Sequence, residues 1–339
     1  MKITKLIKIC IKILANKLFK TNIPVSATLS VTNRCNSKCS YCGYRKREQT
    51  DLSLQEIKKI IDTVCKLGAE RMGFWGGEPL IRKDIEEIID YALSKGLYIT
   101  LDTNGYLAKE NINVLKKVNH VIISLDGDKK YHDANRGTDT FEKVITAIKL
   151  LHENKIKFST ITVLTKNNIF KENIDFILSL SKKYNFSTTF QILHHNSTIG
   201  QNNTNILPSN EQYKDILKYI YDHKKSNNLI ASSNNYFKYL LNWPNLHNIC
   251  SEKETSIKCM AVNYYLNVDT DGKFYPCSVL IDGINGIDYK SKTLIKDLQK
   301  LKDKSNCKSC VCGCFVEYNN IFSLNLSTIF QWFKNIILN

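Results

Sequence analysis

The sequence predicts an α/β fold built on a parallel sheet. Between about residues 27 and 193, short apolar runs alternate with segments of helical periodicity. Six such strand-and-helix units follow one another, and this alternation places helices outside a parallel sheet that is either barrel-like or doubly wound. In both arrangements the functional side chains gather at the carboxyl ends of the strands. Motifs with a chemical role should therefore follow strands directly.

Each element is predicted from its local pattern. The strands are expected at 27–32, 71–74, 98–102, 121–124, 158–164 and 188–193. The intervening helices are expected at 53–67, 84–95, 108–117, 141–154 and 169–183. The first of these helices begins with a capping box, because Ser53 is followed three residues later by Glu56.

The chain after the sixth strand changes character. A polar loop at 196–211 leads into a helical stretch to about Leu241, and a cysteine-rich segment with a hairpin around Asp271-Gly272 follows. We therefore divide the chain into an N-terminal helix, a core barrel, a helical linker region, a small cysteine-rich domain and a C-terminal amphipathic helix, at 1–26, 27–200, 201–258, 259–318 and 319–339.

Composition narrows the class of protein. The 339 residues carry a net charge of +16, which favours anionic partners, but arginine is scarce and unclustered, so nucleic acid is disfavoured. Twelve cysteines would suit a secreted disulfide protein, yet none occurs between Cys65 and Cys250. The pattern indicates a cytoplasmic protein whose thiolates bind metal. We interpret Cys10, Cys65 and Cys250 as ordinary thiols without a metal.

The N-terminal segment predicts an amphipathic helix. Its lysines exclude a spanning helix, because each central Lys would cost about 2.5–3.5 kcal/mol. An apolar stripe lies opposite a lysine-rich face; the stripe is Ile3, Ile7, Cys10, Ile11, Leu14 and Leu18. Two interpretations stay open: a helix packed on the body of the protein, or a helix lying on anionic lipid at the periphery of a membrane.

Three cysteines follow the first predicted strand at once, as Cys35-x3-Cys39-x2-Cys42. Three thiolates within eight residues can hold three irons of a cubane and leave the fourth iron open to an outside ligand. A structural zinc site needs four protein ligands, and no fourth Cys or His lies nearby in the sequence. The spacing therefore favours an iron–sulfur cluster over zinc.

Polar motifs also follow the next strands. Gly76-Gly77-Glu78-Pro79 comes after the second strand, where glycine allows close approach of a ligand and Glu78 offers a carboxylate to an ammonium group. Ser124-Leu-Asp-Gly ends the fourth strand, and Arg136 stands in a predicted loop twelve residues later, where its guanidinium can pair with a carboxylate. Each motif alone is a weak signal; their order on successive strand ends is a strong one.

Together these motifs resemble the radical S-adenosylmethionine (SAM) superfamily, and more narrowly its members with a C-terminal SPASM or twitch domain. The resemblance runs from about Leu29 to Cys314. It implies a partial (β/α)6 barrel, a [4Fe–4S] cluster on the three cysteines, SAM bound to the open iron, and an electron donor such as flavodoxin or ferredoxin. The implied SAM-binding residues are Tyr41, Gly76, Gly77, Glu78, Ser124 and Arg136.

The C-terminal cysteines extend the resemblance. Cys259, Gly272 and Cys277 match a Cys-x9-15-Gly-x4-Cys motif, and Cys307-x2-Cys310 follows. This resembles a twitch domain with one auxiliary [4Fe–4S] cluster. Cys312 and Cys314 come next, and in an extended segment they would face the same way as Cys310. Six cysteines are too few for two cubanes, which need eight, and zinc stays an alternative for this segment.

The substrate is not indicated. Sulfatase maturases carry Asp where this chain has Ser278, so sulfatase maturation is disfavoured; a peptide or protein, a lipid-linked molecule and a small molecule all stay open. The competing hypotheses are an iron–sulfur electron carrier and a zinc-binding scaffold, neither with SAM chemistry. Neither alternative explains Glu78 or Arg136.

Overall fold

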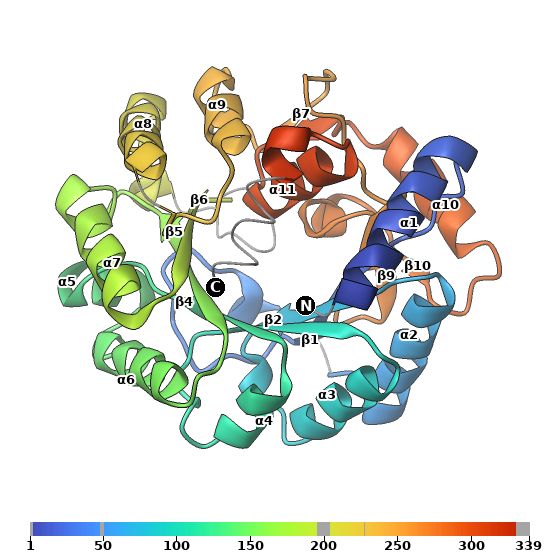
Figure 1. Ribbon diagram of the computed structural model, residues 1–339, viewed down its shortest axis with the longest axis horizontal. Coiled ribbons are helices and arrows are strands. Elements are labelled where there is room, and N and C mark those ends of the chain that lie inside the picture. The colour runs from blue at the N-terminus through green and yellow to red at the C-terminus, as the bar shows by residue number, and fades with distance from the viewer. Residues whose placement is uncertain (1–2, 48–50, 195–203, 227, 330–339) are drawn as a thin grey trace.

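A curved parallel sheet forms the centre of the computed structural model, which describes residues 3–47, 51–194, 204–226 and 228–329. Its strands run in the order β10-β9-β8-β1-β2-β3-β4-β5-β6, and β1 to β6 are all parallel (Figure 1). Because β10 and β6 are the two ends of this order, the barrel stays open. The bounds are β1 Ser26–Thr32, β2 Arg71–Gly76, β3 Tyr98–Thr103, β4 His120–Ser124, β5 Phe158–Leu164 and β6 Ser187–Ile192.

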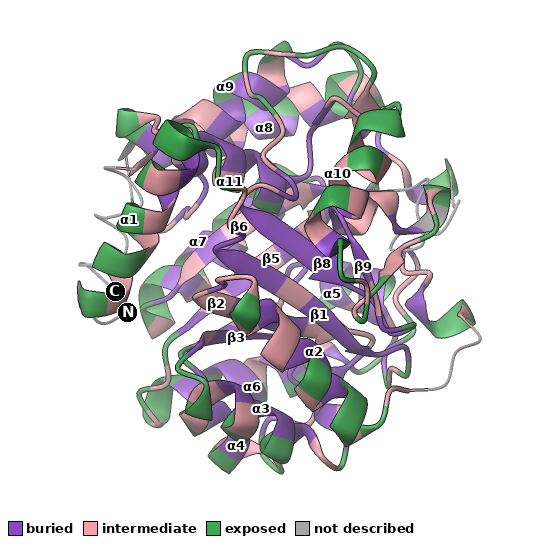
Figure 2. Ribbon diagram, turned by 90° about the vertical axis from the view of Figure 1, so that its right-hand side faces the viewer, coloured by how far each residue is buried: buried purple, intermediate pink, exposed green. Residues whose placement is uncertain are grey.

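Helices cover the outside of the barrel. Each of these helices turns a row of aliphatic side chains onto the strands, and the result is one continuous core. Figure 2 shows the strands buried and the helices exposed on their outer faces. The predicted capping box is confirmed, because Ser53 Oγ accepts from Glu56 N and the Glu56 carboxylate accepts from Ser53 N. The bounds are α2 Leu54–Lys66, α3 Ile85–Ser94, α4 Ile112–Lys117, α6 Phe141–Glu153 and α7 Lys171–Tyr184. The predicted partial (β/α)6 barrel is thereby confirmed.

The cysteine-rich segment joins the barrel sheet. The predicted hairpin is present as β8 and β9, and β8 pairs in parallel with β1, so the hairpin extends the barrel sheet at its first strand. A second small sheet pairs β7 with β11. The bounds of the remaining elements are β7 Cys250–Ser251, β8 Tyr265–Val268, β9 Lys273–Tyr275, β10 Ile287–Asp288, β11 Ser309–Cys310, α8 Asn210–Ser226, α9 Asn234–Asn242, α10 Leu294–Lys304 and α11 Gly313–Phe322.

Two local predictions are wrong. Arg136 does not lie in a loop: it ends helix α5 (Lys129–Arg136), whose N-cap Asp128 accepts from Tyr131 N. The segment after Cys310 is not extended, because α11 begins at Gly313 and turns Cys314 away from the direction of Cys310. The predicted C-terminal helix is helical over 326–329, and its remainder lies outside the described residues.

Candidate active site

The three clustered cysteines lie on the loop that follows β1, and polar hydrogens point at their sulfur atoms. Ser37 N donates to Cys35 Sγ at 3.4 Å, and the Ser37 hydroxyl lies 3.1 Å from Cys39 Sγ. Arg136 Nη1 lies 3.8 Å from the same Cys39 sulfur. Because donors and a positive charge favour the ionised form of a thiol, this loop is prepared to present thiolates.

Burial works against that ionisation in the free protein. Burial, together with neighbouring thiols, raises the pKa of Cys35 to about 12 and that of Cys42 to about 11. These thiols therefore keep their protons at neutral pH until a metal displaces them, and metal loading should release protons.

The arrangement suits a cluster better than a single ion. Among the described residues, no three thiol, imidazole or carboxylate side chains come together as a site for one metal ion. A tetrahedral zinc site would need thiolates about 3.8 Å apart, because each Zn–S bond is ~2.3 Å. A cubane binds each thiolate through a different iron and so holds them further apart. Three thiols on one loop can each bind a different iron of such a cluster.

Glycines hold the end of β2 against the cysteine loop. Gly76 has φ +128°, and a Cβ on Gly77 would come within 2.1 Å of the Arg34 carbonyl oxygen. Gly77 N donates to Thr32 O at 2.7 Å and Glu78 N donates to Arg34 O at 2.8 Å. We expected a ligand at this close approach; the structure places the backbone of the cysteine loop there. The glycines thus fix Glu78 beside the thiols.

Glu78 is buried, and polar hydrogens surround its carboxylate. It accepts from Thr103 Oγ1 at 2.7 Å, Asn104 N at 2.7 Å and Leu80 N at 3.1 Å. Burial nevertheless raises the pKa of Glu78 to about 7, and the hydrogen bonds only partly offset this. The Asn104 side chain also donates to Asn36 Oδ1 at 2.7 Å, which ties the end of β3 to the cysteine loop.

A buried ion pair organises the opposite side of the loop. Arg136 Nε donates to Asp126 Oδ2 at 2.8 Å, and Tyr41 OH donates to the same oxygen at 2.8 Å. The guanidinium also lies over the Tyr41 ring, 5.6 Å from its centroid. Sequence reasoning missed Asp126, although it lies within the Ser124-Leu-Asp-Gly motif, because a carboxylate is not an obvious partner for a SAM-binding arginine.

Ser124 ends β4 on the strand face that it shares with Ile122 and His120, and these two residues line a cavity toward the amino ends of the strands. The structure therefore brings the cysteine loop, Glu78 and the pair of Asp126 with Arg136 together at the carboxyl ends of the strands. Ser124 faces the interior that these groups border.

A second group of thiols gathers where β7 pairs with β11. Cys250 lies opposite Cys310 across this pair. The Cys250 and Cys307 thiols contact each other; the contact lowers the pKa of Cys250 and raises that of Cys307. Burial raises the pKa of Cys310, and neighbouring thiols raise it further; these are Cys312, Cys259, Cys277 and Cys250.

Six thiols thus share one region: Cys250, Cys259, Cys277, Cys307, Cys310 and Cys312. Sequence reasoning set Cys250 aside, since it lies outside the Cys-x9-15-Gly-x4-Cys and Cys-x2-Cys patterns. Only the pairing of β7 with β11 places Cys250 beside the other five thiols. Four thiolates suffice for one cubane and eight are needed for two, so the group fits one cluster with two thiols to spare.

Cys314 faces a different neighbourhood. Its sulfur accepts a hydrogen bond from Gln191 Nε2 at 3.2 Å. The charged groups of Asp102 on β3 and Arg71 on β2 are close enough to shift the pKa of Cys314. Burial raises the pKa of Asp102 to about 7. Asp102 shares a strand face with Tyr98 and Thr100, which line the interior cavity. Cys314 therefore borders the inside of the barrel.

A buried hydroxyl points to an acceptor among the six thiols. Tyr236 is fully buried, and its OH has no hydrogen-bond partner among the described residues. It lies beside the backbone of Gly313. Burial raises the pKa of Tyr236, and nearby Cys312, Glu317, Cys314 and Cys310 raise it further. Sulfur atoms of an iron–sulfur cluster accept hydrogen bonds, so this orphaned donor fits a bound cluster.

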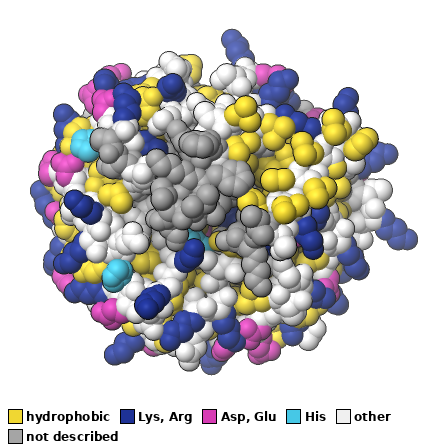
Figure 3. All heavy atoms as spheres, viewed as in Figure 1, with side chains coloured by type: hydrophobic (Ala, Val, Ile, Leu, Met, Phe, Trp, Pro, Cys, Tyr) yellow, Lys and Arg dark blue, Asp and Glu magenta, His cyan; other side chains and the backbone are white. Residues whose placement is uncertain are grey.

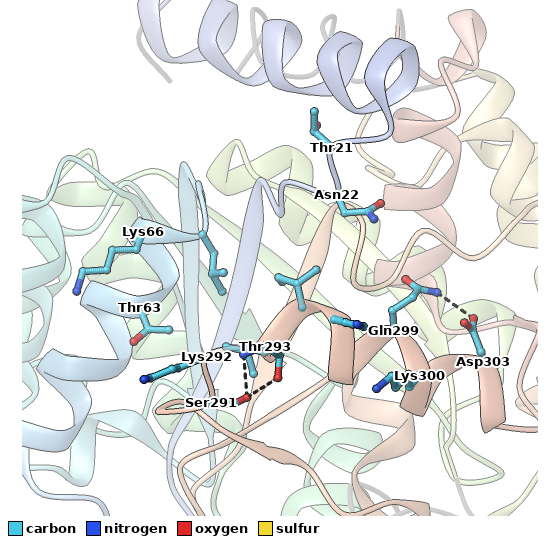
Figure 4. Close-up of a pocket in the computed structure, with 14 residues that line it drawn as sticks. Thr21, Asn22, Thr63, Lys66, Ser291, Lys292, Thr293, Gln299, Lys300 and Asp303 are labelled. Atoms are coloured by element: carbon cyan, nitrogen blue, oxygen red, sulfur yellow. Dashed lines mark hydrogen bonds between the residues drawn. The ribbon is translucent and has the colours of Figure 1, made fainter.

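A separate hollow of about 760 Å³ lies outside the barrel, between α2 and α10. Its lining is polar, with Lys66, Lys292 and Lys300 at the edge, and these lysines do not converge on one point (Figure 4). It contains no cysteine and stands apart from both thiol groups. It is not part of the candidate active site.

Known proteins are similar in sequence to the part of the chain that forms the barrel. Residues 29–177 match the radical SAM superfamily domain. The chain is 33% identical over 147 residues to Fe-coproporphyrin III synthase of Methanosarcina barkeri, covering 41% of this chain and 37% of that one. It is 35% identical over 174 residues to GTP 3′,8-cyclase of Clostridium botulinum, covering 48% and 54%. The matches thus span only about a third to a half of these relatives.

Longer similarities exist at lower identity. AdoMet-dependent heme synthase of M. barkeri is 26% identical over 281 residues, which is 77% of this chain and 78% of that one. Streptococcus suis SuiB, solved bound to precursor peptide SuiA, superposes with a TM-score of 0.66 at 18% identity, over 85% of this chain and 67% of SuiB. The enzyme anSMEcpe, solved with AdoMet and the Cp18Cys peptide, superposes with a TM-score of 0.64 at 19% identity, over 91% and 99%.

The two solved structures show the fold along nearly the whole chain, including the C-terminal part. The sequence match adds the domain that carries the Cys35, Cys39 and Cys42 loop, the glycine turn and Arg136. Residues 29–177 therefore match the radical SAM superfamily domain, and the chain as a whole shares the fold of the two solved structures.

Proposed function

We propose that this enzyme cleaves SAM reductively and directs the resulting radical to a hydrogen atom of an organic substrate. The observation that carries the proposal is the joining of the cysteine loop, Glu78 and Arg136 by hydrogen bonds at one end of the barrel. An electron carrier would need the thiols alone. The buried carboxylate and guanidinium beside them favour a site that also binds a charged small molecule.

The roles follow from the chemistry of each group. Cys35, Cys39 and Cys42 would hold a [4Fe–4S] cluster, which when bound supplies the electron that splits SAM into methionine and a 5′-deoxyadenosyl radical. Glu78 and the neighbouring glycine backbone would receive the methionyl ammonium group. Arg136 would receive the carboxylate, held in position by Asp126.

The remaining expected SAM contacts are Ser124, at the ribose or carboxylate, and Tyr41, at the adenine. Tyr41 is almost fully buried and its hydroxyl is already bonded to Asp126, so its ring rather than its hydroxyl would meet the ligand. The low polarity of this buried site strengthens each charge-assisted contact.

We further propose an auxiliary [4Fe–4S] cluster on Cys259, Cys277, Cys307 and Cys310. Four cysteine ligands leave no open iron, so this cluster would pass electrons rather than bind substrate. Asp102, Gln191 and Cys314, which border the barrel interior, are the groups nearest to a substrate lying between the two thiol groups.

The substrate class is open among peptides, lipid-linked molecules and small molecules. Relatives named above act on or bind both peptides and tetrapyrrole-type compounds, and the barrel interior offers charges of both signs in Arg71 and Asp102. A reducing compartment such as the cytoplasm would keep the thiols available, and an electron donor of the flavodoxin or ferredoxin type would supply electrons. Anaerobic incubation of the reduced enzyme with SAM and fractionated cell extract, followed by measurement of 5′-deoxyadenosine, would identify the fraction that contains the substrate.

The SAM pocket has a direct test. We expect Glu78→Gln and Arg136→Ala each to weaken SAM binding roughly ten- to a hundredfold while iron content stays unchanged, because each removes a charge-assisted contact of about 1.5–3 kcal/mol. Equilibrium binding of SAM to the reconstituted protein measures this. Lys129→Ala, at the exposed start of the same helix as Arg136, serves as the matched control.

Arg136→Ala also leaves the buried carboxylate of Asp126 without its charged partner, and this should lower the melting temperature. The double variant Arg136→Ala, Asp126→Asn removes that unpaired charge and separates the two effects. Unchanged SAM affinity in both Glu78→Gln and the double variant would show that the pocket is misplaced.

A further inference from the structure

Helix α1 (Ile3–Phe19) turns its apolar stripe away from the protein. The exposed fractions are 53% for Ile7, 59% for Ile11, 48% for Leu14 and 73% for Leu18. Phe19, at the end of the helix, is 73% exposed. The helix does pack on the body of the protein, but it does so through the buried Ile13 and the partly buried Ile9 and not through this stripe.

Polar contacts hold the helix in this orientation. Lys5 and Lys12 both pair with the Glu70 carboxylate, at 2.7 and 2.5 Å. Lys12 also donates to Gly68 O at 2.6 Å, and the buried Asn16 amide donates to Ile23 O at 2.8 Å. Rotating the helix to bury the stripe would break each of these bonds. The outward face is therefore a fixed feature of the fold.

Basic side chains border this face. Lys8, Lys17 and Lys20 are exposed, and α1 contains no acidic residue. Figure 3 shows the apolar side chains gathered into one patch over α1, with Lys and Arg around it. Leu326, 80% exposed, follows the segment that α1 contacts, since Lys17 Nζ donates to Ser323 O.

The helix lies across the amino ends of the strands. It borders a mainly apolar cavity of about 760 Å³ there, together with the first residues of β2, β3 and β4. The cysteine loop follows the carboxyl end of β1, at the opposite end of the barrel. A partner bound to α1 would therefore leave the candidate active site uncovered.

We propose that this face of α1 docks on an anionic phospholipid bilayer. An exposed apolar stripe bordered by lysines is the pattern of a helix that lies in the plane of a membrane interface, with its apolar side chains below the headgroups and its lysines among them. No helix among the described residues is long and apolar enough to cross a bilayer. Docking would hold the amino end of the barrel to the membrane and turn the end with the Cys35, Cys39 and Cys42 loop toward water. The proposal stands independently of the SAM chemistry.

Co-sedimentation of the full chain with vesicles tests this. We expect binding to vesicles of phosphatidylcholine with phosphatidylserine, weaker binding to phosphatidylcholine alone, and loss of binding at high salt. Ile11→Glu combined with Leu18→Glu should abolish binding. Phe170→Glu, an exposed apolar residue at the start of α7 and at the opposite end of the barrel, should leave it intact.

Each other outcome overturns the proposal. Binding that survives the two α1 substitutions would place the membrane contact elsewhere. A dimer that dissociates in the same variant, without vesicle binding by the parent, would make a second copy the partner. Binding that appears only after deletion of residues 330–339 would make that segment the occupant of the stripe. Melting curves confirm folding, and Ile7→Ser with Leu14→Ser replaces the glutamate variant if that variant unfolds.

Discussion

Replacing Cys35, Cys39 and Cys42 together with Ala will remove one of two clusters and all SAM cleavage. The reconstituted parent should hold about eight irons, from two four-iron clusters, and the triple variant about four. Under the proposed function these three thiols, which lie on one loop, would be all the protein ligands of that cluster, so the triple change removes every one of them. Iron analysis and measurement of 5′-deoxyadenosine after reduction check both results.

Cys65→Ala is the matched control, because Cys65 is a half-buried thiol on α2 and lies in neither thiol group. It should retain both clusters and full SAM cleavage. Cleavage that persisted in the triple variant would refute the assignment of the cysteine loop.

The auxiliary site should need only four of its six thiols. We expect the variant Cys250→Ala, Cys312→Ala, Cys314→Ala to hold about eight irons, because it keeps Cys259, Cys277, Cys307 and Cys310. Adding Cys259→Ala or Cys277→Ala to this variant should reduce the iron to about four. Removing the spare thiols first prevents Cys250 or Cys312 from replacing a lost ligand.

Iron content, together with Mössbauer or EPR spectra of each variant, shows which cysteines bind the auxiliary cluster. Loss of the second cluster in the variant that keeps four thiols would show that Cys250, Cys312 or Cys314 is a ligand. Stoichiometric zinc in the native protein would contradict an auxiliary cluster altogether.

The barrel and the cysteine loop could be predicted because their signals are local. Aliphatic residues repeat at helical or strand spacing in each unit, and Ser53 with Glu56 marks a helix start by direct contact. The three cysteines of the first loop lie within eight residues, so no long-range information is needed to bring them together.

The features that could not be predicted from the sequence depend on contacts between distant segments. Cys250 joins the auxiliary thiols only through the pairing of β7 with β11, sixty residues later in the chain. Asp126 forms its buried ion pair only because α5 brings Arg136 back to it. The outward stripe of α1 could not be predicted because the helix packs through Ile9 and Ile13 and pairs Lys5 and Lys12 with Glu70, contacts that depend on segments distant in the sequence.

The central proposal is that this chain splits SAM. The most direct measurement is chromatographic detection of 5′-deoxyadenosine and methionine after anaerobic incubation of the reconstituted, dithionite-reduced enzyme with SAM. We predict both products in equal amounts, and none without reductant or in the Cys35, Cys39 and Cys42 triple variant. Intact SAM in the presence of a fully loaded and reduced enzyme, with every substrate fraction tried, would contradict the claim and favour an iron–sulfur electron carrier.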